Sequence, residues 1–395
     1  MSRAQLIEMA RTSMKHAEDG TAPQADSILE IPAEHYFDEA RWEQEMRQVF
    51  KRMPLMVALT CEMPNPQDYR AMEVAGLPIL LIRGDDGEVR AFVNSCRHRG
   101  AQILMEGNGS THRLTCPYHA WTYNLDGALT GVFAHKDFGE FDKDCYSLTP
   151  LPVLERSGLI WVVPNPKGNI DINAFLSGYD AMLAHFGFDN WHLFERRTVK
   201  GPNWKIAYDG YLDLYHLPIL HKDTFGSNFP HRTIYTAWGP HQRVSSPDPS
   251  LLELDADHPE TWDTDRLMTG VWTIFPHVSI AGFEGGGRSV MISQLFPGAT
   301  PQESFTVQNY VMENEPTEAQ AQEAKEQFKF LEYVVQEEDY ATGLRQQQAL
   351  MSGHMSHVLF GKNEGGGQVF HGWVDKLLNT DDEHLNELFG EVSAG

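Results

Sequence analysis

The sequence predicts an α+β fold in which a β-rich part is followed by a part of mixed helices and strands. Turn signals separate short apolar runs in residues 41–165, whereas longer helical patterns join strand-like runs in residues 166–395. Residues 1–40 are polar with one helical stretch, and we expect them to pack as a helical lead-in on the second domain. The chain is therefore predicted to have a lead-in and two domains.

The first elements follow from apolar spacing and turn residues. Apolar side chains four residues apart in 38–51 predict an amphipathic helix. Acidic residues followed by glycine at 85–87 and at 126–127 each predict the turn of a β-hairpin. The region between these two hairpins contains the most informative residues of the first domain.

The second domain combines strands with a long helix. Residues 289–298 and 303–312 have the texture of strands and are expected to be antiparallel neighbours. A threonine and a glutamine three residues later predict a capping box at the start of a helix spanning 317–350. The glycine-rich segment 361–367 is expected to form a loop.

Composition excludes some classes of function. The 395 residues carry a formal net charge of -24, which argues against a nucleic-acid partner because phosphate binding needs a basic surface. The N-terminus lacks an apolar signal core, and the apolar runs are too short to span a membrane, so we expect a cytoplasmic protein with no membrane partner. Nothing in the number or spacing of the four cysteines indicates a disulfide framework.

Two short Cys/His pairs stand out in the first domain. They are Cys96-x-His98 and Cys116-x-x-His119, with 17 residues between His98 and Cys116. Thiolates and imidazoles at this spacing can lie on two loop tips that close on one centre. The donor set suits a tetrahedral zinc ion or a two-iron cluster, and the number of ligands does not decide between them.

The order of the ligands resembles one family. A zinc finger usually groups its cysteines on one knuckle and its histidines on the other, whereas here each knuckle mixes the two. The arrangement resembles the Rieske [2Fe-2S] domain, as do the flanking CRHRG and CPYHAW, with Ala120 at a position where glycine is common. The resemblance implies a [2Fe-2S] cluster held by Cys96, His98, Cys116 and His119.

A second group of polar residues lies near the middle of the chain. Asp209, Asp213 and His216 recur at i, i+4 and i+7, which would place them on one face of a helix. His221 follows five residues after His216, and Pro218 between them could turn the chain so that the two imidazoles meet. These residues alone allow either ordinary polar packing or a metal site.

This stretch resembles the iron-binding segment of Rieske non-haem iron oxygenases, in which NWK leads to D-x-x-H-x4-H. The resemblance implies that His216 and His221 bind a mononuclear Fe(II). It also implies that Asp213 bridges the iron site to the cluster of a neighbouring subunit, as an electron-transfer residue.

A facial triad needs a carboxylate besides two histidines. In the predicted late helix, Asp339 falls about 20° from the apolar Phe328, whereas Glu338 is about 80° away. The segment also resembles the C-terminal ligand region of the family, with an aspartate after a glutamate as the ligand. We therefore expect Asp339 to be the third ligand, with Glu338 as the alternative.

The resemblance implies a Rieske β domain followed by a helix-grip (START-like) catalytic domain with an antiparallel sheet. It implies a terminal oxygenase that activates O2 and acts on an aromatic or other apolar organic substrate by dihydroxylation, monohydroxylation or oxidative demethylation. Electrons would come from NAD(P)H through a separate reductase or ferredoxin, and the chain would form a homotrimer. Two other interpretations are a cluster-only electron-transfer protein and a zinc-stabilised ligand-binding module.

Overall fold

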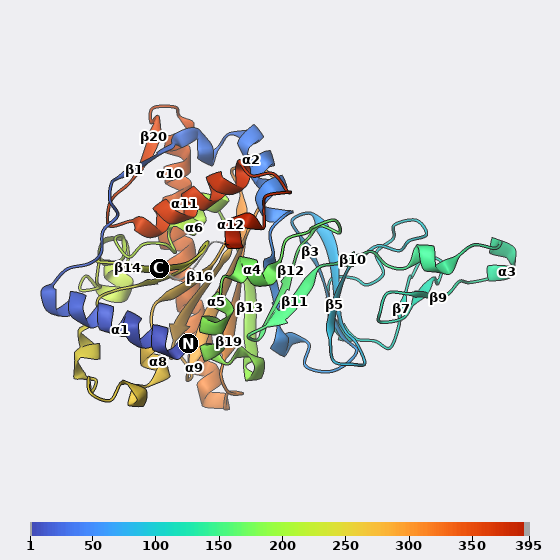
Figure 1. The fold of residues 1–395 in the computed structure, drawn as a ribbon, viewed down its shortest axis with the longest axis horizontal. Coiled ribbons are helices and arrows are strands. Elements are labelled where there is room, and N and C mark those ends of the chain that lie inside the picture. The colour runs from blue at the N-terminus through green and yellow to red at the C-terminus, as the bar shows by residue number, and fades with distance from the viewer. Residues whose placement is uncertain (1, 391–395) are drawn as a thin grey trace. The chain divides into compact units, whose positions relative to one another are not determined.

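The computed structural model describes residues 2–390 and divides the chain into two compact units (Figure 1). The smaller unit is Phe50–Ile172, and the larger unit combines the residues up to Val49 with those from Asn173 onward. The sequence-based boundaries at 40/41 and 165/166 precede these divisions by several residues.

The smaller unit is built from antiparallel sheets. A five-stranded sheet has the order β10-β5-β4-β3-β6, and two three-stranded sheets have the orders β11-β12-β2 and β7-β8-β9. The strands are β2 (Leu55–Leu59), β3 (Asp68–Val74), β4 (Leu77–Arg83), β5 (Val89–Val93), β6 (Gly107–Ser110), β7 (Leu114–Thr115), β8 (Thr122–Tyr123), β9 (Leu129–Gly131), β10 (Pro150–Leu151), β11 (Val153–Arg156) and β12 (Leu159–Val162).

Both predicted hairpins are present in this unit. β4 pairs with β5, and β8 pairs with β9, in antiparallel register. Gly87 and Gly127 each have a φ of 84° in the connecting turns, a conformation that glycine adopts without steric cost. At Gly127 a Cβ atom would also lie 2.6 Å from the ring of Phe92, so the turn packs directly against the core.

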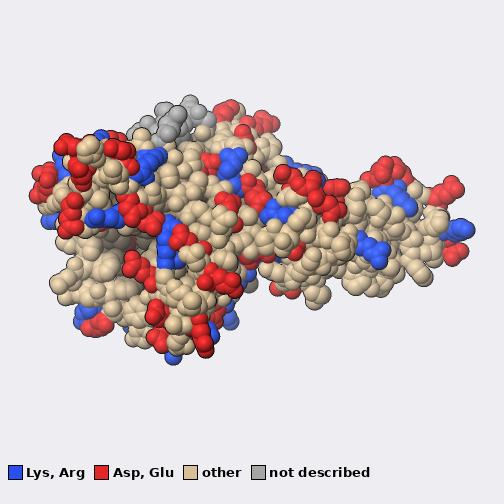
Figure 2. Space-filling model, turned by 90° about the horizontal axis from the view of Figure 1, so that it is seen from below, with Lys and Arg blue, Asp and Glu red and all other residues tan. Residues whose placement is uncertain are grey.

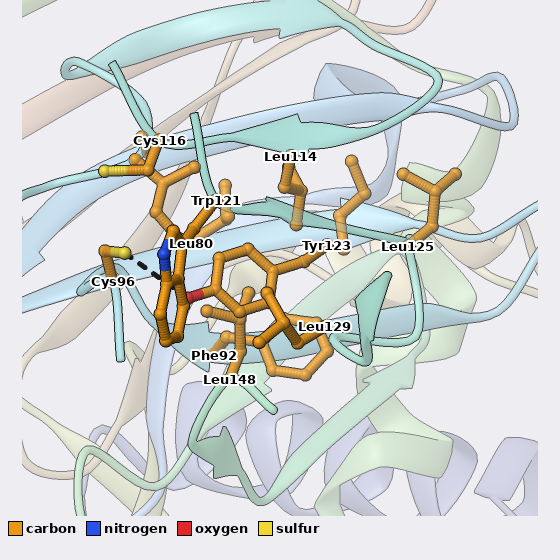
Figure 3. Close-up of a cluster of buried hydrophobic side chains, with 13 residues drawn as sticks. Leu80, Phe92, Cys96, Leu114, Cys116, Trp121, Tyr123, Leu125, Leu129 and Leu148 are labelled. Carbon is orange, nitrogen blue, oxygen red and sulfur yellow. Dashed lines mark hydrogen bonds between the residues drawn. The ribbon is translucent and has the colours of Figure 1, made fainter. Parts of the chain in front are cut away.

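The hydrophobic core of the smaller unit lies beside the two Cys/His knuckles. Figure 3 shows leucine and aromatic side chains gathered between strands of this unit, with Cys96 and Cys116 at one end of the group. Burial of Trp121 and Tyr123, at 2% and 0% exposure, anchors the chain directly after the second knuckle. Buried side chains of this core therefore support both knuckles.

The larger unit contains one seven-stranded antiparallel sheet, in the order β13-β19-β18-β17-β16-β15-β14. Its strands are β13 (His192–Gly201), β14 (Ile234–Trp238), β15 (His241–Ser245), β16 (Val271–Ile274), β17 (Val278–Phe283), β18 (Ser289–Pro297) and β19 (Ser304–Met312). The predicted pairing of 289–298 with 303–312 is confirmed, because β18 and β19 are joined along their full lengths.

Helices α6 (Trp204–Asp209) and α11 (Gly365–Leu378) lie over this sheet (Figure 1). The expected loop at 361–367 is wrong, because the last three of these residues form the first turn of α11. A Cβ atom on Gly366 would lie 2.5 Å from the carbonyl oxygen of Leu212, so a glycine is needed where α11 passes the segment 203–225. These glycines allow close packing rather than flexibility.

The N-terminal residues belong to the larger unit. Helix α1 (Ser2–Asp19) packs against α5 (Tyr179–Leu183) and α8 (Thr264–Leu267), with Leu6 fully buried. Strand β1 (Leu29–Pro32) pairs with β20 (His357–Phe360), which ties the first residues to the end of the chain. The predicted helix at 38–51 is α2 (Glu39–Glu45), continued by a π-helix over Met46–Phe50.

The long late helix has an interruption that matters for the site. Helix α9 (Glu318–Tyr333) begins with the predicted capping box between Thr317 and Gln320. A π-helix then covers Val334–Tyr340, and α10 (Ala341–Met351) completes the rod. π-helical turns occur frequently at functional sites, and this one contains both candidate carboxylates. Among the described residues, no helix is long and apolar enough to cross a membrane.

Candidate metal centres

The two Cys/His knuckles are tight hydrogen-bonded turns. The backbone NH of Gly100 donates to the carbonyl oxygen of Cys96, and that of Ala120 donates to the carbonyl oxygen of Cys116. Gly100 has a φ of 79° and Ala120 a φ of 55°, so both knuckles end in the left-handed region. This conformation explains why glycine suits the position of Ala120, although alanine is accommodated there at some conformational cost.

The side chains of the knuckles converge. Cys96 and Cys116 are buried, and the rings of His98 and His119 lie 4.7 Å apart between centroids. The ring of His98 stacks on Trp121, and its buried Nδ1 atom has no hydrogen-bond partner among the described residues. A buried imidazole nitrogen without a partner is costly unless it binds something, so the site fits a metal ligated by His98.

Tyr123 supports the first knuckle. Its hydroxyl lies 3.3 Å from Sγ of Cys96 and accepts a hydrogen bond from the backbone NH of Arg97 at 3.0 Å. Because the oxygen already accepts from Arg97, the hydroxyl proton is free to point at the sulfur. Burial raises the pKa of the Cys96 thiol, and the Tyr123 hydroxyl opposes that rise. Metal ligation would supply the positive charge that a buried thiolate needs.

The second candidate centre differs locally from the sequence-based expectation. Asp209, Asp213 and His216 do not share one helix, because α6 ends at Asp209 and the chain turns before α7 (Leu217–Leu220). The side chain of Asp213 instead accepts hydrogen bonds from the backbone NH of His216, at 3.1 Å, and from Nδ1 of its ring, at 3.0 Å. Local hydrogen bonding by an aspartate competes with helix formation, which is the physical reason for the break.

His216 and His221 flank the short helix α7, with Pro218 in its first turn. The two rings lie 5.2 Å apart between centroids. A π-helix over Lys222–Gly226 follows directly. Pro218 does not break a longer helix here. It lies at the start of α7, a helix of one turn, and His216 and His221 flank this turn so that their rings converge.

Three ligand atoms converge at this centre. One atom each from His216, His221 and Asp339 lies within 4.8 Å of the other two. Oδ1 of Asp339 is 3.1 Å from Nε2 of His221 and 3.8 Å from Nε2 of His216. Two imidazoles and one carboxylate on the same side of a point form the donor set of a 2-His-1-carboxylate iron site.

The Nδ1 atom of each histidine contacts a further carboxylate. Nδ1 of His221 lies 2.7 Å from Oε2 of Glu338, and Nδ1 of His216 lies 3.0 Å from Oδ1 of Asp213. Burial disfavours protonation of both imidazoles, yet these carboxylates and Asp339 raise the pKa of each histidine above its usual value. The outer carboxylates orient both rings so that Nε2 faces the centre.

Glu338 and Asp339 therefore have different positions although they are neighbours in the sequence. The predicted helical phase assumed a continuous α-helix, whereas both residues lie in the π-helix. Glu338 contacts the back of His221 and accepts a hydrogen bond from the hydroxyl of Thr224 at 2.9 Å. Asp339 is the carboxylate that the structure brings to the two Nε2 atoms.

Sequence reasoning missed a buried cluster beside this centre. The Tyr36 hydroxyl donates to Asp209 at 3.0 Å, and Nε2 of His371 lies 3.0 Å from the same carboxylate. The three residues come from the lead-in, the segment 203–225 and α11, which are far apart in the chain. Only the polarity of Asp209 inside an apolar segment could have indicated them.

One cavity of the larger unit is lined by ligand residues of this centre, and a second lies near it. A cavity of about 280 Å³ is lined by Asp213, His216 and Asp339. A larger one, of about 800 Å³, does not reach the three ligand side chains but is lined by Leu217 and Phe225. The ring of Phe225 lies 5.5 Å from that of His221. The smaller cavity thus opens directly on the ligand group, and the larger one approaches it behind Phe225.

Comparison with known proteins finds a family match for each of the two units. The protein-family model of the Rieske [2Fe-2S] domain matches residues 53–142. The family model of the ring hydroxylating alpha subunit (catalytic domain) matches residues 188–380. The glycine betaine monooxygenase oxygenase subunit of Chromohalobacter salexigens is 35% identical over 218 residues, which cover 53% of this chain and 48% of the relative. The carnitine monooxygenase oxygenase subunit of Escherichia coli K12 is 34% identical over 194 residues, covering 48% of this chain and 52% of the relative. The chain thus spans about half the length of the curated relatives it matches.

Solved structures share the fold. A quaternary ammonium Rieske monooxygenase in its apo form has a TM-score of 0.72 at 23% identity, covering 89% of this chain and 96% of that one. Naphthalene 1,2-dioxygenase from Rhodococcus sp. has a TM-score of 0.73 at 20% identity, covering 95% and 99%. The Rieske domain and the helix-grip catalytic domain are thereby both accounted for. The chain therefore combines a Rieske [2Fe-2S] domain with a domain that matches the ring hydroxylating alpha subunit (catalytic domain) family.

Proposed function

We propose that this protein is a terminal oxygenase component, which uses electrons from a reductase or ferredoxin to activate O2 and oxidise a small organic substrate. The observation that carries the proposal is the convergence of His216, His221 and Asp339 in a chain that also has a Rieske domain. A one-electron cluster and a facial triad make sense together because reduction of O2 takes more electrons than one Fe(II) supplies conveniently.

In the proposed assignment, each candidate ligand residue binds either the cluster or the mononuclear iron. Cys96 and Cys116 would hold one iron of the [2Fe-2S] cluster, and His98 and His119 would hold the other. His216, His221 and Asp339 would hold the mononuclear iron, which supplies O2 activation when bound. Three protein ligands on one face leave the opposite side of the site available.

The protein contributes orientation and charge around these ligands. Glu338 and Asp213 fix the rings of His221 and His216 through Nδ1, so that each presents Nε2 as the ligand atom. Both residues also keep negative charge beside the imidazoles, which strengthens them as donors. Apolar groups such as Leu217 and Phe225 limit the access of water from the larger cavity.

Asp213 is proposed as the electron-transfer bridge. In a head-to-tail homotrimer it would hydrogen-bond His119 or His98 of a neighbouring copy while it holds His216 of its own chain. Its place on the wall of the smaller cavity, about one-fifth exposed, supports this role. The face of the molecule in Figure 2 carries more acidic than basic side chains, in keeping with the formal net charge of -24.

Monooxygenation with oxidative demethylation is the proposed reaction type. The relatives at 32–35% identity are named as glycine betaine and carnitine monooxygenase subunits, whereas anthranilate 1,2-dioxygenase large subunit is 27% identical. Glycine betaine, L-carnitine and anthranilate are therefore the first compounds to test, with electrons supplied from NAD(P)H through a reductase.

The test is a measurement of iron content, visible absorption and low-temperature EPR on wild type and His216→Ala, purified without oxygen. We expect three irons per chain, with a reduced-cluster signal of low average g, and loss of one iron only in the variant. A colourless protein that binds zinc would overturn the proposal in favour of a ligand-binding module. A cluster without a third iron would instead indicate an electron-transfer protein.

A further inference from the structure

A buried arginine lies on the wall of the larger cavity. Arg243, in β15, is only 6% exposed. It lies across from Trp272 in the register of β15 with β16, and its guanidinium is 5.2 Å from the centroid of the Trp272 ring. Its Nε and Nη2 atoms both donate to the carbonyl oxygen of Thr269, at 2.8 and 2.5 Å. The side chain is therefore held in one orientation.

The charge of Arg243 has no counterion in the described part of the chain. Across residues 2–390, no carboxylate lies within ion-pair distance of its guanidinium, and its Nη1 atom has no protein acceptor. Burial lowers the pKa of Arg243 to about 10, so the side chain is still protonated at neutral pH. An unpaired buried cation costs folding free energy, and such groups are normally paired or bind a ligand.

The cavity supplies no alternative partner. Asp265 lines the same cavity but forms an ion pair with Arg288 at 2.5 Å, and Arg288 also contacts Glu313. Asp248, which accepts a hydrogen bond from the backbone NH of Ser250, and Glu284 also line the cavity, and neither forms an ion pair with Arg243. The neighbouring arginine is thus neutralised by the protein's own carboxylates, whereas Arg243 is not.

The same cavity extends toward the candidate iron site. It runs past the ends of β15, β16, β17 and β18, since its walls include Ser245, Val271, Phe283 and Ser289. On another side it is lined by Leu217 and Phe225, which belong to the iron-binding segment. A bound molecule can therefore contact Arg243 with one end and lie beside Phe225 with the other.

We propose that Arg243 binds the carboxylate of the substrate, so that the enzyme acts on anionic or zwitterionic carboxylates rather than on neutral hydrocarbons. The planar guanidinium is suited to a carboxylate, and Nη1 offers the donor that the protein leaves unused. This proposal rests on the proposed function for the identity of the ligand as substrate. Binding of a carboxylate at Arg243 can nevertheless be measured without turnover.

The test compares two small probes of similar size, propionate and the neutral propionamide, on the full chain with its metals loaded. The readout is the concentration-dependent rise in melting temperature, followed by circular dichroism at constant ionic strength set with NaCl. We expect propionate to stabilise the wild type in a saturable way and propionamide to have no such effect. Equal shifts with both probes, or the same shift with added chloride alone, would overturn the proposal.

Substitutions of Arg243 and Arg288 test whether propionate binds at Arg243. Arg243→Gln should weaken propionate binding at least tenfold, and without any probe its melting temperature should equal or exceed that of the wild type, because an unpaired buried charge is removed. Arg243→Lys keeps the charge and should retain weaker binding, which provides a second reading if the glutamine variant does not fold. Arg288→Gln is the matched control and should bind propionate as the wild type does. Unchanged propionate binding in both Arg243 variants would refute the assignment.

Failure of this proposal is distinguishable from failure of the oxygenase function. Absence of the third iron or of O2-dependent turnover would leave the binding measurement intact. Conversely, an active oxygenase that binds propionate no better than propionamide would retain the proposed function and lose the role of Arg243.

Discussion

Nδ1 of His221 lies 2.7 Å from Oε2 of Glu338, and this contact separates the roles of two adjacent carboxylates. With Nδ1 engaged, Nε2 of His221 faces Asp339 at 3.1 Å. Glu338 therefore contacts the Nδ1 atom of His221, whereas the carboxylate of Asp339 lies with the Nε2 ligand atoms. The difference leads to distinct expectations for the two residues.

Asp339→Ala should abolish binding of the mononuclear iron and leave the cluster intact. Glu338→Gln should keep the iron but lower its affinity about 10–100-fold, because a residue that orients a ligand is lost rather than the ligand itself. Iron content during titration with a chelator measures both. Equal iron loss in the two variants would contradict the division of roles.

Asp213→Asn should retain all three irons and lose turnover. The amide can still orient His216, but it removes the negative charge proposed to link the iron site with the cluster of a neighbouring copy. The decisive measurement is the rate at which the pre-reduced cluster is reoxidised by O2 with substrate present. A normal reoxidation rate would rule out the bridging role.

Tyr123→Phe should lower the reduction potential of the cluster. The hydroxyl lies 3.3 Å from Sγ of Cys96, and a hydrogen bond to a ligating sulfur stabilises the reduced cluster. Redox titration followed by visible absorption or EPR would show the shift. Tyr118→Phe is the control, since Tyr118 is 61% exposed beside the second knuckle and its hydroxyl has no hydrogen bond to Cys96.

Lys205→Met should destabilise the larger unit by about 3–5 kcal/mol, because it leaves a buried carboxylate without its main partner. Nζ of Lys205 lies 2.5 Å from Oε2 of Glu45, and both side chains are fully buried. Urea unfolding followed by circular dichroism measures the loss. The double variant Lys205→Met, Glu45→Gln should recover part of it, and no recovery would mean that the methionine itself is not tolerated.

The ion pair of Arg83 and Glu155 should make the smaller unit sensitive to acid. Burial of Glu155 opposes ionisation, but hydrogen bonds from Arg83 and Thr60 lower its pKa overall below the usual 4.5. Because the pKa is lower in the folded state, the stabilisation is complete above pH 4.5 and is lost as the pH falls through the folded value.

Melting temperatures of wild type and Glu155→Gln from pH 7 to pH 3 test this expectation. The wild type should be more stable at pH 7, and the difference should shrink below pH 4.5. Glu73→Gln, an exposed position of the same unit, should show no such trend. A difference that stays constant down to pH 3 would contradict a role for ionised Glu155.

Local signals in the sequence predicted individual elements well. The hairpin turns at Gly87 and Gly127 and the capping box at Thr317 depend on residues that are close in the chain, so their chemistry can be read from the sequence. The segment 361–367 was misjudged because a glycine that permits close packing looks the same in sequence as a glycine that permits a turn. Only the carbonyl of Leu212 beside Gly366 distinguishes them.

The sequence alone was enough to predict the cysteine and histidine ligands of both centres, because their type and spacing follow from short motifs around Cys96, Cys116, His216 and His221. Tertiary structure decided which of Glu338 and Asp339 faces the histidines, since a π-helix changes the direction of both side chains. It also revealed the uncompensated charge of Arg243, because the residues that surround this side chain come from distant parts of the sequence. Contacts between residues distant in the chain depend on how sheets and helices pack, and no local pattern encodes them.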